Sequence, residues 1–146
     1  MAPADEIIAE ARKWIGTPYQ HQASCRGVGA DCLGLVRGVY QAVCGQVLQT
    51  PPPYRAYAQA AEGETLWQAA QTYLLPESLP PRPGHVVLFR LNRYLPARHL
   101  AIVSGPEHMI HALSGAHVCE VRISPWWRRH CVAGFSFPLP RDVRGE

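Results

Sequence analysis

The order in which hydrophobic patterns follow one another is the feature that most constrains the fold of this chain. In the first half, apolar residues recur at helical spacing over residues 3–14, 32–44 and 64–75. In the second half, short runs rich in β-branched and aromatic residues predict strands at residues 85–90, 98–104, 108–113, 117–123 and 131–137. Helices followed by strands favour an α+β fold with an antiparallel sheet.

Caps and prolines divide the chain further. Asp31 is the predicted N-cap of the second helix, and Gly45 is its predicted end. Residues 20–30 are expected to form a loop. The segment 46–63, which holds three consecutive prolines, is predicted to be a connection and a candidate binding edge. The prolines within residues 76–83 are expected to exclude regular structure there.

Composition indicates a globular protein. Of the 146 residues, 47% are apolar and 17% are charged, which suits a single domain over residues 1–146. No apolar run approaches the ~20 residues of a membrane-spanning helix, so we expect no membrane insertion. The net charge of +3 is scattered without a focused basic patch, so we expect no nucleic-acid partner. The first six residues lack the basic start and apolar stretch of a signal peptide, so we expect no export by that route.

The five cysteines indicate neither a disulfide framework nor a zinc motif. Their number is odd, and disulfides are not expected in a chain without an export signal. Their spacing lacks the close pairs of a zinc site, and His21 and Cys25 have no second ligand pair. We therefore expect no metal and no cofactor, and we expect most of the cysteines to be small core residues.

Cys32 stands out because it opens the predicted helix 32–44. Backbone N–H groups at a helix start favour negative charge, so the pKa of a thiol there is expected to be lowered. The same N–H groups can hold the oxyanion that forms when an amide carbonyl is attacked. His99 opens a predicted strand and His111 lies in the next one, so a hairpin would place an orienting group beside a general base.

A structural role for these residues stays open on their spacing alone. A cysteine at a helix start is more often a core residue than a nucleophile, and a histidine on a strand more often serves packing. The chain has seven histidines, so a suggestive pair of a cysteine and a histidine also arises by chance.

The residues around these positions are more specific. In chain order they are Gly16-Thr17-Pro18-Tyr19, Asp31-Cys32-Leu33-Gly34-Leu35-Val36, Arg82-Pro83-Gly84-His85-Val86-Val87-Leu88-Phe89, Arg98-His99-Leu100-Ala101-Ile102-Val103 and Met109-Ile110-His111-Ala112. This ordered set resembles the NlpC-type cell-wall peptidases, a branch of the papain-like cysteine hydrolases, over about residues 5–137. The resemblance implies a papain-like α+β fold, with N-terminal helices packed on a five- to six-stranded antiparallel sheet.

The resemblance also implies roles for five residues. Cys32 matches the nucleophile, His99 the general base and His111 the polar residue that orients the base. Tyr19 matches a tyrosine beside the nucleophile that helps to form the oxyanion hole or to bind substrate, with simple packing on the preceding proline as the alternative. Asp31 matches an acid associated with the substrate groove, alongside its N-cap role. The family usually cleaves the bond between γ-D-glutamate and the diamino acid of peptidoglycan stem peptides, through a thioester and without a metal.

Two positions depart from the family pattern. The family commonly has serine directly after the nucleophile, where this chain has Leu33, which would reshape the pocket beside it. The family commonly has aspartate at the strand entry, where this chain has His85. We expect His85 to be structural, with a role near the cleft as the alternative.

The short form, the Asp-Cys-Leu-Gly sequence and the Trp-Trp-Arg-Arg segment at residues 126–129 resemble most the phage-type subgroup, which is encoded among the tail genes of phages and gene transfer particles. This implies a peptidase on a phage-like particle tail or baseplate, assembled in the bacterial cytoplasm and acting at the wall of the target cell. Tail hub or tail-tip proteins would be its partners. The tryptophans would form a binding patch, with cover of the sheet as the alternative.

Two other functions remain as alternatives. The chain could be a structural docking module of a tail, with little turnover. It could also perform a different reaction on the same scaffold, as an amidase that cuts between the sugar and L-alanine or as an acyltransferase.

Overall fold

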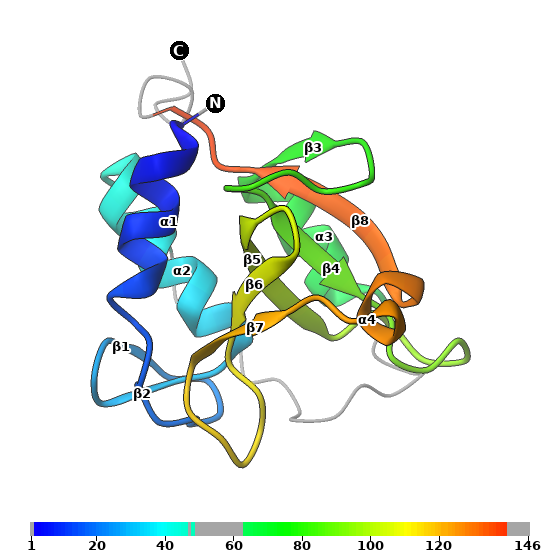
Figure 1. Ribbon diagram of the computed structural model, residues 1–146, viewed down its shortest axis with the longest axis horizontal. Helices are drawn as coiled ribbons and strands as arrows, with labels where there is room; N and C mark the ends of the chain where they lie inside the picture. The colour runs from blue at the N-terminus through cyan, green and yellow to red at the C-terminus, as the bar shows by residue number, and fades with distance from the viewer. Residues whose placement is uncertain (1, 47, 49–62, 140–146) are drawn as a thin grey trace.

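The helical periodicity of the first half produces helices in the computed structural model, which describes residues 2–46, 48 and 63–139 (Figure 1). The three predicted helices are confirmed as α1 (Ala4–Arg12), α2 (Cys32–Cys44) and α3 (Thr65–Tyr73). The predicted binding edge falls largely on residues 49–62, which lie outside the described residues.

Both predicted caps of α2 are confirmed. Asp31 has extended backbone, and its side chain accepts a hydrogen bond from the N–H of Gly34. Gly45 ends the helix at φ 71°, a left-handed conformation that glycine adopts without the penalty of a Cβ. The Asp31 cap fixes the first turn of α2 and therefore the position of Cys32.

The strands of the second half form one antiparallel sheet in the order β3-β8-β4-β5-β6-β7. The predicted strands are confirmed as β4 (Val86–Phe89), β5 (His99–Gly105), β6 (His108–His111), β7 (Cys119–Arg122) and β8 (Cys131–Ser136). In the centre, β5 pairs with both β4 and β6, with Phe89 opposite His99 and Ile102 opposite both Val86 and Ile110. The expected α+β arrangement, with N-terminal helices and a five- to six-stranded antiparallel sheet, is confirmed with six strands.

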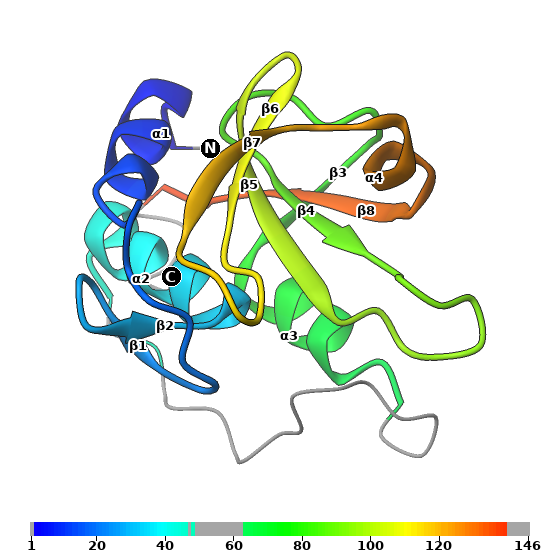
Figure 2. The ribbon, with the colours of Figure 1, turned by 60° about the horizontal axis from the view of Figure 1, so that its bottom comes forward.

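Side chains alternate between the two faces of this sheet, and different elements cover each face. The inner face joins α1 and α2 in the main core through Val86, Leu88, Leu100, Ile102 and Ile110. The outer face carries a second apolar cluster made by Val87, Phe89, Ala101, Val103, Met109 and Ile123. Trp127 of α4 (Pro125–Arg129) packs on this outer cluster, and Figure 2 shows α4 on the opposite side of the sheet from α1 and α2.

Two expectations about irregular segments were wrong. Residues 75–77 form β3 (Leu75–Glu77) despite Pro76, because β3 lies at the sheet edge, where a proline need not donate to a ladder. The predicted loop at residues 20–30 contains a small hairpin of β1 (Ser24–Cys25) and β2 (Gly29–Ala30). Strands of two residues are too short to show an alternating pattern, so the sequence carries no signal for them.

The expectation that most cysteines are core residues was also wrong. All five are free thiols; Cys44 is buried, Cys25 is exposed and the others are half-buried. Separately, none of the helices in the described part of the chain has the length and apolar character needed to span a membrane.

Candidate active site

The buried carboxylate of Asp31 organises the segment in front of the nucleophile. Its Oδ1 atom accepts the N–H of Gly34, and its Oδ2 atom accepts the N–H of Gln22, both at 2.7 Å. The Nδ1 atom of His21 lies 3.9 Å from the same Oδ2 atom. Asp31 is only 3% exposed, so it acts as an internal clamp that joins the hairpin segment to the start of α2.

Because Gly34 has no side chain, the backbone at Ala23 and Ser24 can lie directly against α2. A Cβ atom at Gly34 would overlap the carbonyl group of Ala23. The Oγ atom of Ser24 donates to the Gly34 carbonyl at 2.7 Å, which holds the contact from the other side. The glycine two residues after Cys32 is therefore a packing requirement of the site.

Cys32 lies in the first turn of α2, half-buried against the start of β5. Its Sγ atom donates to the carbonyl oxygen of Arg98 at 3.8 Å. Arg98 directly precedes His99, so the thiol and the imidazole that were predicted to react come from adjoining points of α2 and β5.

The expectation that the helix start lowers the pKa of Cys32 is wrong for this resting state. Burial raises the pKa of the thiol to about 12, and the Asp31 carboxylate adds to the rise. Backbone groups of Leu100 and Leu33 oppose this effect without overcoming it. Asp31 contributes because the residue that caps the helix start is a buried carboxylate, which disfavours a second negative charge beside it.

His99 and His111 are brought together as predicted for a base and its orienting group. The Nε2 atom of His99 lies 2.9 Å from the Nδ1 atom of His111, and both side chains are buried. The two histidines belong to neighbouring antiparallel strands, β5 and β6. Because His111 engages Nε2, a further partner of the His99 ring would meet its Nδ1 atom.

His99 is neutral in this environment. Burial lowers its pKa to about 3, and the nearby charges of His111 and Arg98 lower it further. Burial also lowers the pKa of His111. With the pKa of Cys32 raised as well, the thiol and the imidazole are both uncharged at neutral pH.

The position of Tyr19 is set by its backbone. Its N–H donates to the carbonyl of Ala116 at 3.0 Å, and its neighbours Pro18 and Gln20 both bond to Ala30. Tyr19 is half-buried and packs against the main core. Tyr19 therefore lies beside β2, the strand that leads into Cys32. Its part in an oxyanion hole stays a prediction.

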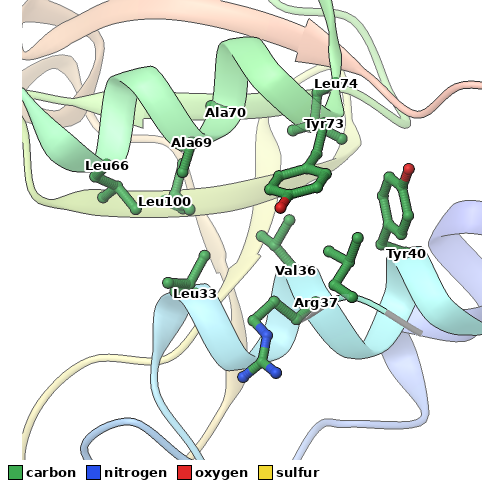
Figure 3. A pocket seen from close by; sticks show the side chains of 11 residues that line it. Leu33, Val36, Arg37, Tyr40, Leu66, Ala69, Ala70, Tyr73, Leu74 and Leu100 are labelled. Carbon is green, nitrogen blue, oxygen red and sulfur yellow. The ribbon is translucent and has the colours of Figure 1, made fainter. Parts of the chain in front are cut away.

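The two departures from the family pattern have different outcomes. His85 is buried, and its Nδ1 atom accepts the N–H of Arg82 at 3.1 Å, as expected for a structural residue. Leu33 lines an apolar pocket between α2 and α3 (Figure 3). The opposite wall includes Leu66 and Ala70, and Leu100, which directly follows His99, also lines the pocket. The pocket therefore adjoins Cys32 and His99, the residues that precede Leu33 and Leu100.

The site also contains an aromatic residue to which the sequence assigned no part in the chemistry. Trp127 of α4 stacks on His99, with ring centroids 5.2 Å apart, whereas its neighbour Trp126 is 43% exposed. Cover of the sheet is thus found for Trp127, whereas Trp126 faces solvent and its part in a binding patch stays a prediction. The only signal in the sequence was the aromatic segment itself.

A metal site needs several donor side chains that the fold brings together. Within the described ranges, no group of three or more histidine, cysteine, aspartate or glutamate side chains is arranged to hold a metal ion.

Known proteins share this fold and part of this sequence. The chain is 33% identical over 106 residues to the Gamma-DL-glutamyl hydrolase of Bacillus subtilis (strain 168), a match that covers 73% of this chain but only 22% of that protein. The structure superposes on the NlpC/p60 domain of the peptidoglycan hydrolase SagA with a TM-score of 0.65 and 24% identity, covering 92% of this chain and 99% of that one. An NlpC/P60 protein from Bacillus cereus ATCC 10987 gives a TM-score of 0.66 at 17% identity, covering 94% of this chain and 41% of that one.

The model of the NlpC/P60 family matches residues 16–135, a range that contains Tyr19, Asp31, Cys32, His99 and His111. The peptidoglycan hydrolases of that family are cysteine peptidases, so the predicted enzyme class is confirmed at the level of the family. With most of its length matched and its fold shared, this chain belongs to the NlpC/P60 family.

Proposed function

We propose that this chain hydrolyses peptidoglycan stem peptides at the bond between γ-D-glutamate and the diamino acid. The observation that carries the proposal is the bond between His99 Nε2 and His111 Nδ1, next to the point where the Cys32 thiol meets the start of β5. Family membership and the γ-glutamyl hydrolase among its relatives support the choice of substrate.

The proposed reaction begins with a neutral pair. His99 Nδ1 accepts the proton of the thiol as Sγ attacks the amide carbonyl, and the carbon becomes tetrahedral. Backbone N–H groups in the first turn of α2 are placed to stabilise the oxyanion; Asp31 occupies the N–H of Gly34, which leaves those of Cys32 and Leu33. His99 then gives its proton to the leaving amine, and a thioester to Cys32 remains.

Hydrolysis of the thioester completes the cycle. Water attacks the acyl carbon while His99 Nδ1 takes one of its protons, and the proton returns to Sγ as the thiol leaves. His111 keeps the ring of His99 in one orientation through both steps, since the same nitrogen must face first the amine and then the water.

Digestion of purified sacculi tests the proposal. The wild-type protein is expected to release stem-peptide fragments whose masses identify a cut after γ-D-glutamate, and Cys32→Ala is expected to release none while keeping its fold. Cys25→Ala is the matched control, since Cys25 is an exposed free thiol in the β1–β2 hairpin. Undiminished release by Cys32→Ala would contradict the assignment of Cys32 as the nucleophile. Fragments cut between the sugar and L-alanine would show that the protein is an amidase instead.

We propose further that the domain acts on a phage-like particle tail, against hub or tail-tip proteins. The exposed Trp126 ring and the exposed Arg128 and Arg129 side chains of α4 support this, because tryptophan and arginine are the residue types that dominate binding hot spots. Particles purified from the producing strain are expected to carry the chain, and to lose it with Trp126→Ala. Absence of the chain from such particles would contradict the location. A chain present on particles but inactive on sacculi would instead favour the docking module.

A further inference from the structure

The indole ring of Trp127 lies against both histidines of the site. It stacks on His99 with centroids 5.2 Å apart and an interplanar angle of 30°. It also meets His111 edge-on, with centroids 5.4 Å apart and an interplanar angle of 87°. One ring therefore spans the two imidazoles that share the 2.9 Å hydrogen bond.

Local structure holds Trp127 in this place. Ser124 caps α4, and its Oγ atom accepts the N–H of Trp127 at 3.3 Å. Beneath the indole, Phe89 packs at a centroid distance of 4.8 Å, and Phe89 itself lies 5.9 Å from His99. The imidazole of His99 is thus enclosed by Phe89, Trp127 and His111, and it is only 4% exposed.

We propose that Trp127 is a positioning residue for the general base, covering the hydrogen bond between His99 and His111 and fixing the orientation of the His99 ring. The inference rests on the role given to His99 in the proposed function. Its physical basis is that a flat apolar ring over a hydrogen bond excludes water, which would otherwise compete for Nε2 and let the imidazole rotate.

Covering the pair also keeps it uncharged. The charged groups that act on His99 are His111 on β6 and Arg98 beside it, and the titratable thiols packed nearby are Cys32 on α2 and Cys131 on β8, the latter in the cluster of Phe89 and Trp127. No anion in this set would offset the cost of burying an imidazolium. Removal of the indole lets water reach His99 and His111, which lowers the free-energy cost of protonating either imidazole.

The test compares Trp127→Ala and Trp127→Phe with Trp67→Ala, a half-buried tryptophan on α3 that lies under Arg90. Ring signals of His99 and His111 are followed by NMR against pH, after assignment with His99→Gln and His111→Asn. In Trp127→Ala the titration midpoints are expected to move up by roughly one pH unit, toward the ordinary value for histidine. Trp127→Phe is expected to move them part of the way, and Trp67→Ala not at all.

Kinetics on stem-peptide substrate give the second readout. Trp127→Ala is expected to lower kcat roughly 10- to 100-fold, to change KM less than threefold and to move the acid limb of the pH profile upward, with most of the rate restored in Trp127→Phe. Unchanged histidine midpoints in the Trp127 variants overturn the inference. If the midpoints shift but the wild type cuts no peptide, the proposed function fails and the positioning of the histidines by Trp127 stands.

Discussion

The carboxylate of Asp31 lies 2.7 Å from the N–H of Gly34, which places a buried negative charge at the helix start where a thiolate would form. The contact stabilises the fold through the cap and at the same time opposes ionisation of Cys32. Asp31 therefore stabilises the helix as its cap but disfavours the thiolate form of Cys32.

Replacing Asp31 with asparagine separates the two effects. Asparagine also caps helices but carries no charge, so Asp31→Asn is expected to lower the pKa of Cys32 and to raise its alkylation rate at pH 8, with about tenfold more thiolate for each unit of pKa. Alkylation by iodoacetamide, read at the Cys32 peptide by mass spectrometry, measures this. An alkylation rate equal to that of the wild type would show that the charge of Asp31 does not govern the thiol.

His111 is expected to matter through His99. His111→Ala removes the partner of Nε2, so kcat/KM on stem peptide should fall about 100-fold, whereas His111→Asn, which keeps a polar partner, should lose less. His108→Ala is the matched control, because His108 is an exposed histidine at the start of the same strand. Equal rates for His111→Ala and His108→Ala would remove His111 from the mechanism.

The buried, uncharged state of His99 predicts a pH dependence of stability. Its pKa is about 3 in the folded protein and about 6.5 in the unfolded chain, so the unfolded state alone takes up a proton between these values. The contribution to stability is complete above pH 6.5 and is lost as the pH falls toward 3, by about 1.4 kcal/mol per pH unit. Urea unfolding at pH 7.5, 6 and 5 is expected to show this loss, and His99→Gln is expected to show less of it. A variant with the same slope as the wild type would assign the loss to other groups.

The tight contact at Gly34 predicts a cost for the smallest possible side chain. In Gly34→Ala the new Cβ meets the Ala23 carbonyl, and relief would pull Asp31 away from Gln22. The free energy of unfolding is expected to fall by about 1–3 kcal/mol. Gly105→Ala, on β5 with open space around it, should cost less in the same urea titration. A loss at Gly34 no larger than at Gly105 would contradict the packing argument.

Local patterns predicted most elements of the fold. Helix periodicity, the Asp31 and Gly45 caps and the alternating runs of the second half each arise within about a dozen neighbouring residues, and all were found within a few residues of their expected bounds. The β1–β2 hairpin was missed because each of its strands has only two residues, and β3 was missed because its partner, β8, is distant along the chain. Pro76 in particular forbids a central strand but not an edge strand.

The sequence by itself determined which groups are present and in what order: a cysteine at a helix start, a histidine opening one strand and a second histidine in the next. Only the tertiary structure decided their state. The folded chain buries both groups, packs Phe89 and Trp127 against His99 and sets the Asp31 carboxylate beside Cys32, so the thiol and the imidazole rest uncharged rather than as an ion pair. The physical reason is that ionisation depends on the polarity and charge of everything within a few ångströms, and residues far apart along the chain supply most of that surrounding.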